Sequence, residues 1–247
     1  MDKNYNFIDE SGNAEFFGKG GKQLWLEEGW HPLLIMGLAQ TEDRKLLRKE
    51  IMEIHEEIVN DPLYKGIYSL DNKSHYFHAR VDHPEIRAAF FQFLKRRTDF
   101  ICYFVITYKN PDLFITNFNK SATKFYFNCV KKLLELSCFN KSKKHHFYLS
   151  QRNKTTNERF AEVIKDALVL EMSEDQLDYQ AEIVKSSEYP ELCVIDYVLW
   201  ALQRYLLKGE KRFLNALEGK INLIQVCDGK DDKINIYSLS DFLSLRG

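Results

Sequence analysis

The order of apolar and amphipathic segments predicts an α/β fold, in which helices flank both faces of a mixed β-sheet. Strand-like apolar segments come first, at residues 5–8, 24–30 and 33–39. From residue 44 onward, helical patterns alternate with single strands. Grouped strands followed by this alternation are typical of a sheet covered by helices.

Two segments carry the clearest patterns. Residues 44–59 place Leu46, Leu47, Ile51, Ile54 and Ile58 at helical spacing, and Asp61-Pro62 ends the predicted helix. Residues 100–108 (FICYFVITY) form an apolar run that predicts a buried strand. Asn110-Pro111-Asp112 then predicts a break in the chain.

The remaining elements follow from the same criteria. Asp82 is a favourable N-cap for a helix that starts at Pro84. Helices are predicted at residues 84–96, 122–136, 157–170, 192–207 and 212–217, strands at 145–149 and 181–185, a hairpin at 221–226 and 234–237, and a last helix near residue 242. We therefore expect an α/β domain over residues 1–218, with a C-terminal hairpin and helix over residues 219–247 packed on the same domain.

Composition and charge narrow the class of protein. The chain has 247 residues, of which 45% are hydrophobic. Its net charge is −1, so the protein as a whole has no positive field that would indicate nucleic-acid binding. A near-neutral net charge is still compatible with a local basic patch that binds nucleic acid. The five cysteines form no Cys-x-x-Cys pair, which predicts reduced thiols in a reducing compartment. No signal sequence and no run of roughly 18 apolar residues is present. We expect a cytoplasmic protein without a membrane partner.

The first candidate site residues lie in residues 7–12, which read FIDESG. Asp9 and Glu10 follow an apolar strand directly, and Gly12 supplies a turn. Carboxylates at the end of a core strand are costly unless their charge is compensated. A divalent cation such as Mg²⁺ or Mn²⁺ held by carboxylate oxygens provides that compensation.

The second acidic signal is Asp196, which stands in a helical segment with almost no other polar group nearby. On a helix it shares a face with Leu192 and Trp200, four residues away on each side. A helix that is apolar on nearly every side is largely buried, so an ionised Asp there needs a cation or hydrogen-bond donors. Two interpretations stay open: a metal ligand that faces Asp9, or a structural Asp that pairs with an arginine or caps a neighbouring element.

Together, FIDESG, the His78-Ala79 pair and the late apolar helix with Asp196 resemble the bacterial family called domain of unknown function 3800, over roughly residues 4–207. The resemblance implies an RNase H-like fold, whose carboxylates hold two magnesium ions that activate water and stabilise the leaving oxygen of a phosphodiester. It therefore implies a Mg²⁺- or Mn²⁺-dependent nuclease or phosphodiester hydrolase, with bacterial defence or mobile elements as the biological setting by fold-level analogy.

The resemblance implies a role for each residue that matches a position of the family's motifs. It implies catalytic roles for Asp9, Glu10, His78 and Asp196, with Asp9 and Asp196 as metal ligands. Ser187 matches a serine that precedes the final helix. The sequence departs from the family pattern at Cys193 and Ile195, where Gln and Ala are usual, and at Tyr76 and Ser150-Gln151, where acids are expected.

Basic side chains near these motifs predict contacts with phosphate groups. Arg80, Arg152 and Lys154, together with Ser11, are the candidates for binding nucleic acid. The alternative to a nuclease is a catalytically degenerate RNase H-like module that binds nucleic acid, a protein partner or a second copy of the chain. A third carboxylate beside Asp9 and Asp196, from Glu10 or Asp82, favours the enzyme, whereas Arg80 or Arg152 in that place favours the module.

Overall fold

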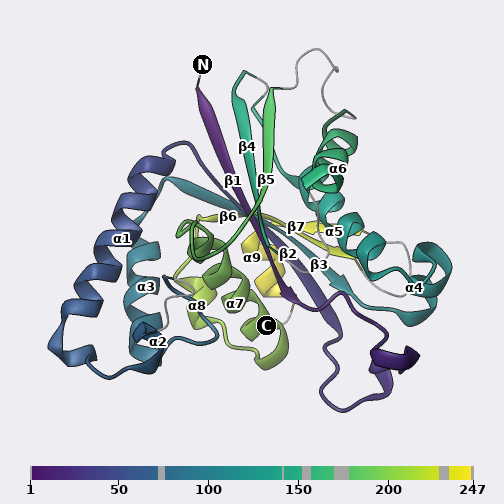
Figure 1. Ribbon diagram of the computed structural model, residues 1–247, viewed down its shortest axis with the longest axis horizontal. Helices are drawn as coiled ribbons and strands as arrows, with labels where there is room; N and C mark the ends of the chain where they lie inside the picture. The colour runs from purple at the N-terminus through teal and green to yellow at the C-terminus, as the bar shows by residue number, and fades with distance from the viewer. Residues whose placement is uncertain are drawn as a thin grey trace.

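The computed structural model describes residues 2–71, 76–140, 142–151, 157–169, 178–227 and 234–245. Within these ranges the strands form one seven-stranded sheet in the order β5-β4-β1-β2-β3-β6-β7 (Figure 1). The strands are β1 (Lys3–Gly12), β2 (Leu33–Thr41), β3 (Phe100–Tyr108), β4 (Lys144–Ser150), β5 (Tyr179–Val184), β6 (Ile221–Cys227) and β7 (Ile234–Tyr237).

The sheet is mixed. β1, β2 and β3 form an antiparallel meander, and β4 and then β5 continue from β1 in parallel. The parallel strands need long crossovers, and helices supply them. This arrangement confirms the predicted α/β class, a mixed sheet flanked by helices.

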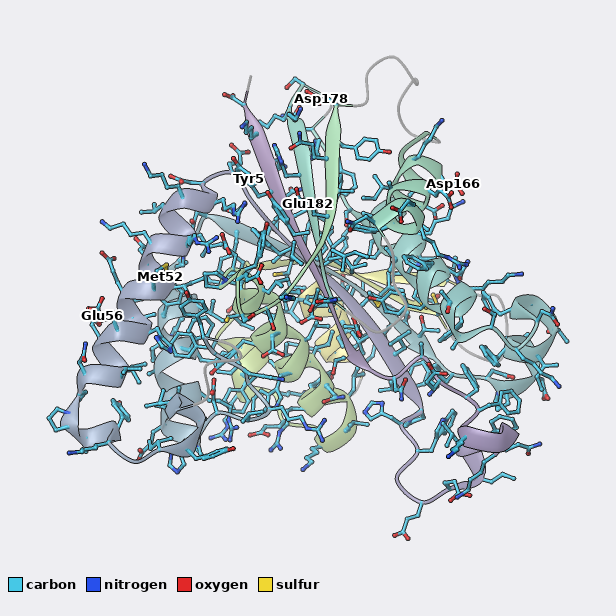
Figure 2. The ribbon with its side chains drawn as sticks, viewed as in Figure 1. Tyr5, Met52, Glu56, Asp166, Asp178 and Glu182 are labelled. Carbon is cyan, nitrogen blue, oxygen red and sulfur yellow. The ribbon has the colours of Figure 1, made fainter. Side chains whose placement is uncertain are left out.

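Helices cover both faces of the sheet (Figure 1). One face packs against α1 (Arg44–Asn60), α2 (Tyr68–Asp71), α3 (Pro84–Arg96), α7 (Leu192–Lys208), α8 (Arg212–Asn215) and α9 (Leu239–Ser244). The other packs against α4 (Pro111–Phe118), α5 (Ala122–Leu136) and α6 (Asn157–Val169). The α1 helix buries Leu47, Ile51 and Ile58, whereas Met52 and Glu56 are exposed on it (Figure 2).

Alternation along β1 assigns each side chain to one of these two faces. Phe7 is buried in the core on the α7 face, whereas Ile8 is buried in the core on the α5 face. The C-terminal hairpin continues the same sheet, because β6 pairs in parallel with β3 and β7 pairs with β6. The division of the chain between residues 218 and 219 stays a prediction.

One local prediction was wrong and another was incomplete. Residues 24–30 contain a short 3₁₀ turn at Leu24–Leu26 in place of a strand, because Trp25 packs edge-on against Phe17 within the loop itself, at 5.1 Å between ring centroids. The predicted break at Asn110-Pro111-Asp112 does end β3, but no helix was predicted after it, and α4 begins there, since the Asn110 side chain accepts hydrogen bonds from the backbone N–H groups of Asp112 and Leu113.

The approach of α7 to the sheet depends on Gly37. A Cβ atom at this position would lie 2.8 Å from both Ile195 Cδ1 and Phe104 Cε1. Gly37 is the register partner of Asp9 in the β1–β2 pair. The close packing of α7 over Gly37 therefore places the middle of this helix beside Asp9.

The start of α7 is held by an ion pair to α1. Glu191 is fully buried, and its Oε1 accepts a hydrogen bond from Arg44 Nε at 2.7 Å. The same guanidinium donates to the Tyr148 hydroxyl at 2.8 Å and lies 4.9 Å from the centre of the Tyr189 ring. A buried carboxylate with this pairing fixes where the helix begins.

Candidate active site

A cleft of about 550 Å³ lies between the end of β1 and one side of α7. Ser11, His31, His78, Arg80, Asp196 and Gln203 are among the residues that line it. The β1 strand ends at Gly12, whose φ of +100° and close approach to the Leu33 carbonyl exclude a side chain. The tight turn at Gly12 ends β1 at this cleft.

Asp9 lies on the face of the sheet that α7 covers, next to Glu10, which lines the cleft. Its Oδ1 accepts a hydrogen bond from the Glu10 backbone N–H at 2.9 Å, and its carboxylate also interacts with the Ser150 side chain. Burial raises the pKa of Asp9 well above the usual range, and the negative charges of Glu10 and Asp196 raise it further. The two hydrogen bonds offset only part of this effect on the pKa.

Asp196 faces the same region from α7. Its Oδ2 accepts a hydrogen bond from the Ala79 backbone N–H at 2.7 Å and lies 3.3 Å from His78 Nδ1. The interaction with Asp196 raises the pKa of His78 against the opposing effect of burial, and the charges of Asp9 and Asp82 add to the rise. His78 is therefore biased toward its cationic form beside an acidic pair.

The loop that carries His78 is attached to α7 at two further points. Cys193 Sγ interacts with the backbone N–H and carbonyl of Phe77, at 3.3 Å and 3.1 Å. The Tyr197 hydroxyl donates to Asp82 Oδ2 at 2.6 Å, and that oxygen also accepts the His78 backbone N–H at 2.8 Å. One turn of α7 thus positions residues 77–82.

These contacts give Asp82 a different role from the expected one. The N-cap of α3 is His83, without a side-chain hydrogen bond, and Asp82 is buried with only 3% of its surface exposed. The prediction of Asp82 as the N-cap was therefore wrong, because its carboxylate is engaged by Tyr197 and the His78 backbone. Sequence reasoning also missed Tyr197, whose position next to Asp196 on an apolar helix was its only signal.

Glu10 is among the residues that line the cleft, but its side chain reaches toward the opposite face of the sheet. β1 continues to Gly12, so alternation directs Glu10 toward α5, where its Oε2 accepts a hydrogen bond from the Tyr126 hydroxyl at 3.0 Å. Its charge still raises the pKa of Asp9. Glu10 therefore acts on the acidic pair through its charge while its carboxylate is held on the other side of β1.

Among the residues that the structure describes, no group of three or more His, Cys, Asp or Glu side chains is arranged to hold a metal ion. Ser150 stands beside Asp9, at one of the positions where an acid was expected. Tyr76, at the other, packs edge-on against the His55 ring at 5.3 Å. The facing carboxylates of Asp9 and Asp196, with their mutual repulsion, suit one divalent cation and do not suit a pair of cations.

The predicted phosphate contacts divide into two groups. Ser11 and Arg80 both line the cleft, and Arg80 is exposed. Arg152 and Lys154 lie outside the described residues. No helix in the described part of the chain has both the length and the apolar character needed to cross a membrane.

No family model and no curated protein sequence matches this chain. Among solved structures, it is similar to ribonuclease H2 from Pyrococcus horikoshii OT3, with a TM-score of 0.49 and 15% sequence identity over 85% of this chain and 77% of the other. It is also similar to a chain from the PCNA:RNase HII complex of Archaeoglobus fulgidus, with a TM-score of 0.46 and 12% identity over 90% of this chain and 82% of the other.

Proposed function

We propose that this chain is a divalent-cation-dependent hydrolase of phosphodiester bonds in nucleic acid, and a divergent member of the domain of unknown function 3800 family. One observation carries the proposal: α7 packs through Ile195 on Gly37, the register partner of Asp9, so that Asp196 and Asp9 lie near one another and the charge of Asp196 raises the pKa of Asp9. A fold that brings two carboxylates together in this way creates a site that a cation stabilises.

Asp9 and Asp196 are the proposed ligands of Mg²⁺ or Mn²⁺. When bound, the cation supplies positive charge to the phosphate and increases the acidity of water. His78, oriented by Asp196, is placed to contact a phosphate oxygen or to hand over a proton at its ring nitrogen. The charge of Glu10 raises the pKa of Asp9, and Ser11 and Arg80, which line the cleft, contact the phosphate backbone. Arg152 and Lys154, which lie outside the described residues, stay predicted phosphate contacts.

A second candidate function has its own support. Ser150 occupies the place of an expected acid, and Arg80 shares the cleft with Asp196. These features favour a catalytically degenerate module that binds nucleic acid, a protein partner or a second copy of the chain. The two candidates differ in whether the acidic pair binds a cation.

Calorimetric titration with Mg²⁺ and Mn²⁺ tests the proposal, followed by cleavage assays on RNA and DNA. We expect one cation bound per chain, and loss of both binding and cleavage in Asp9→Asn and Asp196→Asn. The matched control is Asp166→Asn, which changes an exposed Asp on α6 (Figure 2) and leaves both unchanged. Retained nucleic-acid binding without cation binding would favour the module instead.

A further inference from the structure

The far end of the cleft holds a hydrogen-bonded pair, His31 and Gln203. His31 Nδ1 lies 2.9 Å from the Leu33 carbonyl oxygen, which can only accept, so this nitrogen carries the proton. In the neutral ring Nε2 is then an acceptor, and it receives a hydrogen bond from Gln203 Nε2 at 3.0 Å. The pair therefore fixes which way the Gln203 amide is turned.

The rest of the Gln203 amide remains available to a ligand. Gln203 is half-buried and lines the cleft, and within the described ranges it makes no other hydrogen bond. A fixed amide with one acceptor and one remaining donor matches the adjacent donor and acceptor on the edge of a nucleobase.

The surroundings suit one nucleotide. Leu199, Trp200 and Leu207 give the cleft apolar surface on the α7 side, and Leu207 is 47% exposed. Arg80 and His78 lie in the same cleft near Asp196. The volume of about 550 Å³ is in the range that holds a small-molecule ligand.

We propose that this end of the cleft binds one unpaired nucleobase of a single-stranded nucleic acid, with the Gln203 amide reading the base edge and Arg80 contacting the adjoining phosphate. The inference rests on the proposed function, since it assigns a substrate class to the same cleft. Within a duplex the Watson–Crick edges are already paired, whereas the bases of single strands are free to enter a recessed polar site. The apolar wall formed by α7 accommodates the face of the base.

Fluorescence anisotropy tests this inference without requiring a metal or hydrolysis. Labelled homopolymer octamers of DNA and RNA, and a duplex of the same length, are titrated with the full chain in EDTA. We expect single strands to bind about tenfold or more tightly than the duplex, and the affinities to differ among the homopolymers. Gln203→Leu removes the amide and leaves an apolar side chain of comparable volume, so the differences among homopolymers should shrink to about twofold or less.

Two other variants distinguish recognition of the base edge from the electrostatic contact with the phosphate. Arg80→Ala should weaken binding to every homopolymer by a similar factor. It should also reduce the slope of log K against log salt concentration by about one, the value for one lost phosphate contact. Gln92→Leu makes the same substitution at an exposed position on α3 outside the cleft and should leave the binding profile unchanged. Thermal unfolding of each variant establishes that it is folded.

Equal binding of duplex and single strand, or an unchanged homopolymer profile in folded Gln203→Leu, would overturn the inference. The same measurements distinguish failure of the nucleobase site from failure of the proposed hydrolase. If base-dependent binding is found but no cation binding or cleavage, the nucleobase site stands and the hydrolase does not. If cleavage is found and Gln203→Leu changes nothing, the hydrolase stands and the nucleobase site does not.

Discussion

Ser150 at the end of β4 interacts through its side chain with the Asp9 carboxylate at the end of β1. The two strands run in parallel with Ile8 opposite Leu149, so the next residue on each strand reaches the same place. At this place a side chain from β4 meets Asp9. The Ser150 hydroxyl there donates a hydrogen bond to Asp9, whereas a carboxylate in its place would add a negatively charged ligand for a cation.

Ser150→Asp should therefore strengthen the cation site. We expect the affinity for Mg²⁺ or Mn²⁺ to rise about tenfold or more, because a further carboxylate increases the ligand charge. The metal-free variant should unfold at a lower temperature than the unsubstituted protein, since three carboxylates then repel one another, and added Mg²⁺ should reverse this loss. Calorimetry and thermal unfolding measure the two effects. Ser150→Ala is the control, and an affinity that rises equally in both variants would contradict the prediction.

The raised pKa of Asp9 predicts how stability depends on pH in the metal-free protein. The folded chain holds a proton on Asp9 at pH values where an unfolded chain, with a carboxyl pKa near 3.8, has released it. The contribution of this group to the free energy of unfolding is therefore full below that pKa and is lost as pH rises through the raised, folded value. Asp9→Asn lacks this titration.

Urea unfolding in EDTA at a series of pH values gives the difference between the protein and Asp9→Asn. We expect the protein to lose stability relative to the variant as pH rises from about 4 upward. Saturating Mg²⁺ should remove this loss, because the cation replaces the proton. A difference that stays constant with pH would show that Asp9 titrates normally.

Gly37→Ala tests how closely α7 packs over the sheet. The added Cβ would lie 2.8 Å from Ile195 Cδ1 and from Phe104 Cε1, so we expect the free energy of unfolding to fall by about 1–3 kcal/mol. Ile195→Val removes one of these atoms and by itself costs about 0.5–1.5 kcal/mol. Denaturation of both single variants and of the double variant measures the coupling. The double variant should lose less than the sum, and strict additivity would argue against the contact.

Tyr197→Phe tests the attachment of the His78 loop to α7. The hydroxyl donates to the buried Asp82 at 2.6 Å, so its removal should destabilise the protein by about 1–3 kcal/mol. The His78 backbone shares that oxygen, so NMR titration should also show a changed pKa of His78. Tyr205→Phe is the matched control, since this equally buried tyrosine on α7 bonds the Leu243 carbonyl instead. An unchanged His78 titration in Tyr197→Phe would mean that the loop is held without this bond.

Much of the secondary structure follows from local patterns. β3 and α5 have the predicted bounds, because an unbroken apolar run and a helical period both act over neighbouring residues. The 24–30 segment was predicted wrongly because its aromatic side chains pack within a loop, which an apolar pattern does not distinguish from a strand. The start of α4 was missed because Asn110-Pro111 is a break in one context and a helix start in another.

The sequence by itself determined the alternation of Asp9 and Glu10 along β1 and the presence of an acid within the apolar helix α7. It also placed Asp9 on the same side as Phe7, since strand periodicity is a property of the local backbone. Only the tertiary structure decided that β1 extends past Glu10, that Asp82 bonds Tyr197, and that Asp196 lies beside His78 and near Asp9. These relationships join distant segments through close packing, such as that of Ile195 over Gly37, and no local pattern in the chain encodes such a contact.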